Sequence, residues 1–137
     1  MTQTELGRPR RRVVVDASAV LRLLLYGSSE AAAVIGSDEL AAPEVIVPET
    51  LNGLVSAVRF TTLELDEAAA LLERFLTLPI EIVPDRELAD KTLGIGIDFG
   101  LSAYDASYVA LALTRDVPLV TADKPVAARY GRSELIP

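Results

Sequence analysis

Four acidic side chains stand where a strand is expected to end or a helix to begin, and together they have the chemistry of a divalent-cation site. They are Asp16 after Val-Val-Val, Glu49 in Val-Pro-Glu-Thr-Leu-Asn, Asp105 in Ser-Ala-Tyr-Asp-Ala-Ser-Tyr and Asp123 in Leu-Val-Thr-Ala-Asp-Lys. In an open α/β sheet, residues at the carboxyl ends of parallel strands gather at one edge, where ligands bind. Carboxylates within ~5 Å of one another repel by about 3 kcal/mol per pair at an effective dielectric near ~20. A divalent cation removes this repulsion, activates water and stabilises charge on a phosphoryl group.

Each of the four residues also has a local explanation. Asp16 and Asp123 can cap the helices that follow them, because a carboxylate before the first turn accepts backbone N–H groups. Ser102 and Asp105 have the spacing of a capping box. Glu49 in a first helical turn is favoured by the helix dipole. Only the joint pattern, two carboxylates after strands and two at the start of neighbouring helices, favours a shared cation site.

The composition narrows the chemistry further. The chain has 137 residues and contains neither His nor Cys. This excludes a Ser-His-Asp triad, a cysteine nucleophile and the usual Cys/His zinc sites. A metal would be held by oxygen, which favours Mg²⁺ or Mn²⁺. Because disulfides, a signal core and a long uncharged apolar segment are all absent, we expect a cytoplasmic protein without a membrane partner.

The length fits a single domain over residues 13–137, preceded by a basic leader over residues 1–12 that we expect to be flexible. The net charge is −7, and the rest of the chain is more acidic still because the leader is basic. Such a body differs from a generic nucleic-acid binder, which shows a basic stripe. The leader's arginines are either solvated or form an arm that contacts phosphates. They are Arg8, Arg10, Arg11 and Arg12.

Strand and helix patterns alternate along the chain. Strands are expected at residues 13–15, 40–42, 80–83, 117–121 and 135–136. Helices are expected from residue 18 to a break at residue 27 and at residues 29–36, from Pro43 onward through residue 58, 66–76 with Asp66 as cap, 85–93, 102–114 and 124–129. This alternation predicts an α/β fold with a parallel sheet covered on both faces.

Asp98 is a further acidic residue just upstream of the Asp105 motif. Its neighbours Gly94, Gly96 and Gly100 predict a loop, so Asp98 is interpreted as a turn residue and is left out of the site.

The motifs, in this order, resemble those of the PIN-domain ribonucleases, and specifically of the VapC-type toxins of bacterial toxin-antitoxin pairs. The resemblance covers nearly the whole chain from Val13 onward. The first motif is similar to the family's opening, in which an aspartate, here Asp16, ends the first strand and a hydroxyl residue, here Ser18, follows. The second is similar to the family's helical glutamate, here Glu49, with Asn52 three residues later.

The segment Leu-Ser-Ala-Tyr-Asp-Ala-Ser-Tyr around Asp105 is the strongest match, and Thr121 and Asp123 match the closing motif. The resemblance implies a three-layer α/β/α sandwich with a central parallel sheet that hydrolyses RNA phosphodiesters with an activated water. It implies that Ser18, Asn52 and Thr121 orient ligands or position substrate. The residues implied to hold Mg²⁺ or Mn²⁺ are Asp16, Glu49, Asp105 and Asp123.

The resemblance further implies a homodimer and a small antitoxin partner whose C-terminal segment occludes the site. Two departures are the long arginine-rich leader and the acidic net charge, which leaves the path of the RNA unexplained. Tyr104 and Tyr108, four residues apart on an apolar helix, are expected in the core or an interface rather than stacked on bases. Basic residues that are candidates for RNA contacts are Arg22, Arg59, Lys124, Arg129 and Arg132.

Two other classes of function remain open. A receiver- or phosphatase-like Mg²⁺-binding phosphoryl-transfer module also uses acidic residues at strand ends. A haloacid-dehalogenase-type phosphatase has a second aspartate where Ser18 stands, and a receiver has its acceptor aspartate after the middle strand, where this chain runs directly into Pro84 and Asp85. A PIN-like scaffold that binds RNA or protein without cleavage loses part of the acidic set, and all four positions are filled here.

Overall fold

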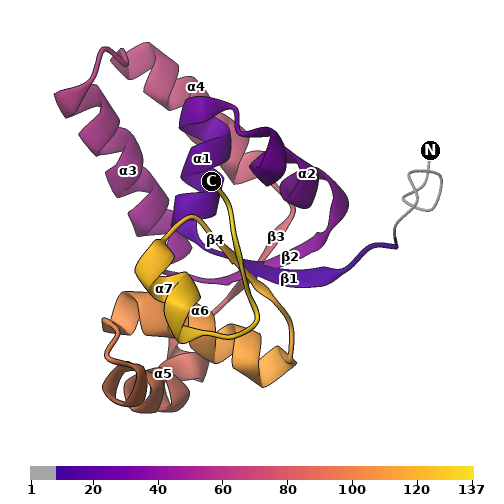
Figure 1. The fold of residues 1–137 in the computed structure, drawn as a ribbon. Helices are drawn as coiled ribbons and strands as arrows, with labels where there is room; N and C mark the ends of the chain where they lie inside the picture. Colours follow the sequence, from indigo (N-terminus) through magenta and orange to yellow (C-terminus); the bar gives the residue numbers. More distant parts are fainter. Residues whose placement is uncertain (1–8) are drawn as a thin grey trace.

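The computed structural model describes residues 9–137, which form a parallel sheet between two layers of helices (Figure 1). Its strands are β1 (Arg12–Val15), β2 (Glu39–Pro43), β3 (Ile80–Val83), β4 (Leu119–Thr121) and β5 (Ser133–Leu135). Its helices are α1 (Ala17–Tyr26), α2 (Ser29–Ser37), α3 (Ile46–Phe60), α4 (Leu65–Thr77), α5 (Asp85–Phe99), α6 (Ala103–Arg115) and α7 (Lys124–Arg129). The expected three-layer α/β/α sandwich is confirmed.

The sheet has five strands in the order β3-β2-β1-β4-β5, and every pair is parallel. Helices α1 to α4 lie on one side of the sheet and α5 to α7 on the other (Figure 1). The strand β1 is central, and Val13, Val14 and Val15 are almost fully buried because helices cover both faces. The strand order reverses between β1 and β4, which places a topological switch point between Asp16 and Thr121.

Helix α3 begins later than the sequence predicts. Pro43 does not open it but ends β2, where it pairs with Val83, and α3 begins at Ile46. A proline at the end of a strand removes only one ladder donor, so the pairing continues to that residue. The cap of α4 also differs, because Glu64 rather than Asp66 precedes the helix. The N–H of Glu64 donates to Oε1 of Glu67 at 2.9 Å.

The expected loop at Gly94 and Gly96 was wrong, because α5 runs through both glycines and ends only at Gly100, whose φ is 65°. A Cβ on Gly96 would lie 3.3 Å from the carbonyl oxygen of Leu101 in the turn after α5 and 3.7 Å from Cβ of Ala106 in α6. Tertiary packing therefore outweighs the low helix propensity of glycine. Asp98 is consequently an exposed helical residue and not a turn residue.

The proposed basic leader falls largely on residues 1–8, outside the described residues. Of its remaining residues, Arg12 begins β1, and Arg11 is ion-paired with Asp38 at 3.0 Å and Glu134 at 2.7 Å. Within residues 9–137 no single helix is long and apolar enough to cross a membrane; α1 and α2 pass such a test only as a pair, which is bent by 118°.

Candidate active site

Asp16 is the most enclosed carboxylate at the carboxyl edge of the sheet, with 5% of its surface exposed. Its Oδ1 accepts hydrogen bonds from the hydroxyl of Ser18 at 2.6 Å and from the N–H of Ala19 at 3.0 Å. Its Oδ2 accepts a hydrogen bond from the hydroxyl of Thr121 at 2.5 Å. Asp16 therefore caps α1, as its local explanation predicted, and also joins the ends of β1 and β4.

The protons of this network can be assigned from its donors. The oxygen of Ser18 accepts from the N–H of Ala122 at 2.8 Å, and that of Thr121 accepts from the N–H of Asp123 at 3.0 Å. Since each hydroxyl has one hydrogen, both hydrogens are directed at Asp16, and the 3.2 Å contact between the two hydroxyls carries no proton of its own. Three donors on one carboxyl group favour its ionised, acceptor-only form.

Burial nevertheless makes that charge costly. Desolvation raises the pKa of Asp16 to about 6, against the opposing hydrogen bonds of Ser18, Thr121 and Ala19, and the charge of Asp123 raises it further. The site thus holds a carboxylate whose negative charge is only partly compensated by the protein.

Glu49 lies in the first turn of α3 and is held by a tyrosine from the other helical layer. The hydroxyl of Tyr108 in α6 donates to Oε1 of Glu49 at 2.6 Å. Burial raises the pKa of Glu49, the bond from Tyr108 opposes the shift, and the charges of Asp105 and Asp85 reinforce it. Asp85, in the first turn of α5, is an acidic neighbour that the sequence motifs did not indicate.

Asp105 and Asp123 occupy the starts of α6 and α7. The N–H of Asp105 donates to the Ser102 cap at 3.2 Å, and Oδ1 of Asp123 accepts from the N–H of Val126 at 3.0 Å. Burial raises the pKa of Asp105, and the charge of Asp123 raises it as well. Asp105 therefore lies in the first turn of α6 and Asp123 caps α7, and their negative charges repel each other.

The structure brings the four acidic residues together as electrostatic neighbours. Asp123 acts on Asp16 and Asp105, and Asp105 acts on Glu49, each by raising the pKa of its neighbour. Among residues 9–137, however, no three acidic side chains are arranged so that they could hold a metal ion as they stand. Both oxygens of Asp16 are already engaged in hydrogen bonds. The arrangement is a concentration of negative charge and not a closed coordination sphere.

The chemistry of the donors fits a hard divalent cation. All four groups are carboxylates, and oxygen ligands are those that Mg²⁺ and Mn²⁺ prefer. The side chain of Asn52, one turn after Glu49, makes no hydrogen bond within the described residues. With Glu49, Val45, Pro48 and Tyr104 it lines an open hollow of about 290 Å³ beside the acidic residues. This hollow gives a ligand access to Glu49.

The expected RNA-contacting residues differ in how far they are engaged. Arg22 lies over the ring of Tyr26 at 5.5 Å. Arg129 donates to the carbonyl of Phe99 at 2.6 Å, and Arg132 to the carbonyl of Asp116 at 2.6 Å. Arg132 lies next to β5 at the amino end of the sheet, away from the acidic residues.

Only two of the five basic candidates, Arg59 and Lys124, are exposed without a side-chain hydrogen bond or ion pair in the described part of the chain. Of the two tyrosines, Tyr108 is buried as expected, whereas Tyr104 is 62% exposed and is not a core residue.

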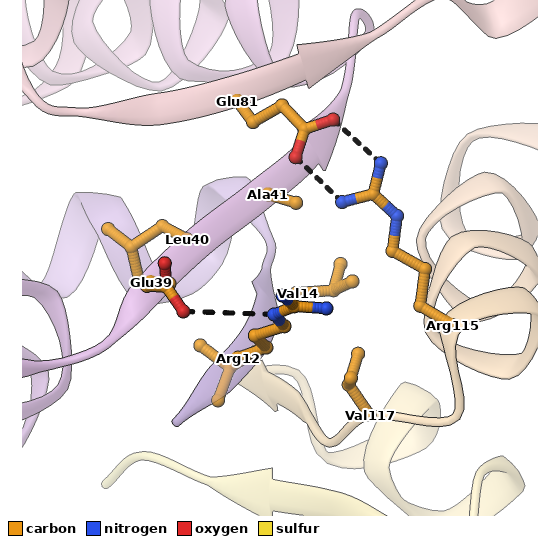
Figure 2. A pocket seen from close by; sticks show the side chains of 9 residues that line it. Arg12, Val14, Glu39, Leu40, Ala41, Glu81, Arg115 and Val117 are labelled. Atoms are coloured by element: carbon orange, nitrogen blue, oxygen red, sulfur yellow. Dashed lines mark hydrogen bonds and ion pairs between the residues drawn. The ribbon is translucent and has the colours of Figure 1, made fainter. Parts of the chain in front are cut away.

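A larger hollow, of about 450 Å³, lies at the opposite edge of the sheet, where β1 and β2 begin (Figure 2). There Arg115 donates to both carboxylate oxygens of Glu81 at 2.7 Å, and Arg12 lies 3.7 Å from Glu39. Every charge drawn in Figure 2 is thus neutralised by a partner, and the hollow contains none of the uncompensated carboxylates that suit a cation. The candidate active site is therefore the one at the carboxyl edge.

Tyr108 is a residue of the candidate site that the sequence motifs did not indicate. It was treated as packing because its spacing from Tyr104 fits an apolar helix face. The informative spacing was instead from Asp105 to Tyr108, since residues three apart on a helix lie on the same side.

Comparison with known proteins agrees with this geometry. A family model described as PIN domain matches residues 13–131. Ribonuclease VapC9 of Mycobacterium tuberculosis is 35% identical over 111 residues, which are 81% of this chain and 85% of that protein. The crystal structure of PAE2754 from Pyrobaculum aerophilum is similar with a TM-score of 0.73 and 24% identity, covering 90% of this chain and 87% of the other.

A toxin-antitoxin complex from Klebsiella pneumoniae contains a chain with a TM-score of 0.60 and 15% identity, covering 89% of this chain and 95% of its own. At this identity the likeness concerns the fold. The family model and the 35% identical ribonuclease each cover most of the chain. The chain therefore belongs to the PIN-domain family, among its VapC ribonucleases.

Proposed function

We propose that this chain is a metal-dependent endoribonuclease that hydrolyses RNA phosphodiester bonds in the cytoplasm, as the toxin of a toxin-antitoxin pair. The observation that carries the proposal is the set of partly buried carboxylates at the switch point. Asp16 is enclosed there by two hydroxyl donors, and the charges of Asp123 and Asp105 reinforce the negative field. Metal dependence is general in this family of nucleases, and the oxygen-only donor set favours Mg²⁺ or Mn²⁺.

In this proposal Asp16, Glu49, Asp105 and Asp123 hold the cation. When bound, the cation supplies activation of water and stabilisation of charge on the phosphate. Engaging Asp16 requires at least one of its oxygens to be shared with the hydroxyl donors that now occupy it.

The protein's own groups position the carboxylates that would hold the cation. Ser18 and Thr121 keep the carboxylate of Asp16 ionised and fix its plane. The bond from Tyr108 occupies Oε1 of Glu49, and Oε2 has no hydrogen bond from residues 9–137. Oε2 is therefore the oxygen of Glu49 that is open to the cation. The free amide of Asn52 in the adjoining hollow is placed to contact substrate.

The charge distribution points to selective binding of RNA. A chain at −7 attracts RNA weakly, so recognition must depend on local positive groups and on the cation itself. Arg59 and Lys124 are the candidates best suited to contact phosphates, because their charges are not already committed within the described residues.

The proposal includes a small antitoxin partner and a homodimer. Large apolar side chains are exposed on three helices, among them Phe60 at 81%, Leu65 at 72% and Ile97 at 76%. Apolar surface of this kind is commonly covered by partners. The similar fold of a chain in the Klebsiella toxin-antitoxin complex supports a partner of the antitoxin type.

The decisive experiment is incubation of total cellular RNA with the purified protein in Mg²⁺, in Mn²⁺ and with chelator, followed by mapping of the cut ends. We expect a small number of defined cuts that require the divalent cation. Cleavage that persists in chelator contradicts the metal-dependent mechanism. RNA binding without any cleavage at saturating Mn²⁺ contradicts the nuclease assignment and favours a binding scaffold.

A further inference from the structure

The two ends of helix α7 carry polar residues that face different neighbours. Asp123 caps its start at the carboxyl edge, and Arg129 ends its last turn. Nη1 of Arg129 donates to the carbonyl oxygen of Phe99 at 2.6 Å. Phe99 is the last residue of α5, so Arg129 binds the end of a helix on a different part of the chain. Figure 1 shows α7 beside the hairpin formed by α5 and α6.

This contact is chemically favourable and closely shaped. The final carbonyl groups of a helix lack intrahelical partners and carry the negative end of its dipole, and both features suit a guanidinium donor. The following residue, Gly100, has a φ of 65°, which glycine adopts without strain. A Cβ at that position would lie 3.3 Å from Nη1 of Arg129. Glycine at residue 100 therefore both ends α5 and leaves room for the guanidinium.

The contact bridges the two elements that carry Asp123 and Asp105. The turn after Gly100 leads through Ser102 into α6, whose first turn contains Asp105. Within residues 9–137, no other hydrogen bond or ion pair joins α7 to α5 or α6. Asp105 and Asp123 repel each other across this junction.

We propose that Arg129 is a positioning residue that holds the α7 segment bearing Asp123 against the α5–α6 hairpin bearing Asp105, so that the two carboxylates can share one cation. The inference rests on the proposed metal-dependent nuclease function. In this inference Arg129 makes a structural contact within the protein. The alternative role for a basic residue near such a site is a contact with the RNA. The two roles differ in what they change: a tether changes metal affinity, whereas an RNA contact changes the KM for RNA and its dependence on salt.

The chain provides a matched control. Arg132 also donates through Nη1 to a carbonyl at the end of a helix, that of Asp116 after α6, over the same distance of 2.6 Å, and is in addition ion-paired with the carboxylate of Asp116 at 2.6 Å. That contact lies at the amino edge of the sheet. Arg129→Met and Arg132→Met therefore remove the same charge and the same type of helix-end contact, but only the first alters the junction of Asp105 and Asp123. Arg129→Lys restores a donor and a positive charge with different geometry.

The experiment titrates Mn²⁺ into each full-length variant by calorimetry, and measures kcat and KM for RNA at several Mn²⁺ concentrations. We expect Arg129→Met to weaken Mn²⁺ binding by about 10-fold, the lower end of the range for residues that orient metal ligands. At saturating Mn²⁺, kcat should return to near wild type with KM for RNA unchanged. Arg129→Lys should recover part of the affinity, and Arg132→Met should bind Mn²⁺ like wild type.

Several results overturn the inference, and they differ from failure of the proposed function. Wild-type Mn²⁺ affinity in Arg129→Met with a raised KM for RNA makes Arg129 an RNA contact. Equal loss of Mn²⁺ affinity in Arg129→Met and Arg132→Met makes the effect one of general stability. A wild-type chain that binds no Mn²⁺ and cleaves no RNA instead overturns the proposed function, and the positioning role with it.

Discussion

Tyr108 in α6 donates its phenolic hydrogen to Oε1 of Glu49 in α3 across 2.6 Å. The two helices lie in opposite layers of the sandwich (Figure 1), so this bond joins the layers at the active edge. Tyr108 is 2% exposed, and burial and the bond to Glu49 raise its pKa far above the ordinary range, so it remains a neutral donor at any physiological pH. Glu49 is thereby fixed in one orientation with its other oxygen free of donors from the described residues.

We expect Tyr108→Phe to impair cleavage mainly at low pH. The hydrogen bond from Tyr108 lowers the pKa of Glu49, so its removal leaves burial and the charges of Asp105 and Asp85 to raise that pKa further. The acid limb of the pH-rate profile should then move to higher pH. Stability should fall by about 1 kcal/mol, the usual net loss for one hydrogen bond.

Tyr130→Phe is the control for this prediction. Tyr130 is also buried and donates its hydroxyl, but to the carbonyl of Val117 at 2.9 Å at the amino edge of the sheet. It should lose comparable stability while its pH-rate profile matches wild type. A profile of Tyr108→Phe that coincides with that of Tyr130→Phe would show that the bond to Glu49 does not tune the site.

Asp16→Asn and Asp105→Asn are each expected to abolish RNA cleavage with the fold intact. Each removes a charge from the cation site and also relieves repulsion in the metal-free protein. The control is Asp98→Asn, which changes an exposed carboxylate of α5 outside the site. Circular dichroism and cleavage assays at matched Mn²⁺ measure both properties, and full activity of Asp16→Asn would remove Asp16 from the site.

The same Asp16→Asn variant gives a prediction for stability against pH. Between the ordinary pKa of 3.8 and the raised pKa of about 6, residue 16 is ionised in the unfolded chain but protonated in the folded chain. The unfolded state then binds fewer protons, so the stability of the metal-free wild type falls as pH rises across this window. A pKa rise of roughly two corresponds to a loss of about 3 kcal/mol across this window. Urea denaturation from pH 4 to pH 7 should therefore show the Asp16→Asn variant gaining stability relative to wild type as pH rises, and parallel curves would contradict the shift.

Thr121→Val should impair cleavage less than Asp123→Asn, and raising Mn²⁺ should restore part of the activity of Asp123→Asn alone. Asp123 contributes charge, and the resulting loss of metal affinity can be offset by concentration. Thr121 contributes a neutral hydroxyl to Asp16, which keeps its bonds from Ser18 and Ala19. Valine preserves the β-branched shape of this fully buried strand residue. Cleavage rates across a Mn²⁺ titration test the order; if Asp123→Asn is insensitive to metal, Asp123 is a helix cap only.

Expression of the chain alone in bacteria should arrest growth, and coexpression of its small cognate partner should relieve the arrest. Expression of Asp105→Asn provides the control, because it keeps the fold but should lose cleavage. Growth curves and sequencing of RNA ends measure the effect. Uniform degradation of all RNAs would contradict selective recognition, and normal growth with the active protein would contradict the role as a toxin.

Much of the architecture was determined by local sequence. The run of three valines before Asp16 is apolar on both sides of the strand, which specifies a central parallel strand, and the order of strands and helices then restricts the crossovers to a layered sandwich. The order and spacing of the four acidic motifs indicated one family and one edge of the sheet. These features are local or sequential, so they could be predicted without coordinates.

Other features depended on contacts between distant segments. Helix α5 continues through Gly96, where the following turn and α6 pack closely against it, a restraint that helix propensity does not contain. The partners of Asp16 include Thr121, 105 residues away, and the pKa of Asp16 depends on burial that only the assembled layers create. The sequence motifs predicted which carboxylates would form the candidate site. Tertiary structure decided which hydroxyls orient them, that Tyr108 holds Glu49 and that Arg129 binds the end of α5, because these interactions form only when the two helical layers and the sheet are packed together.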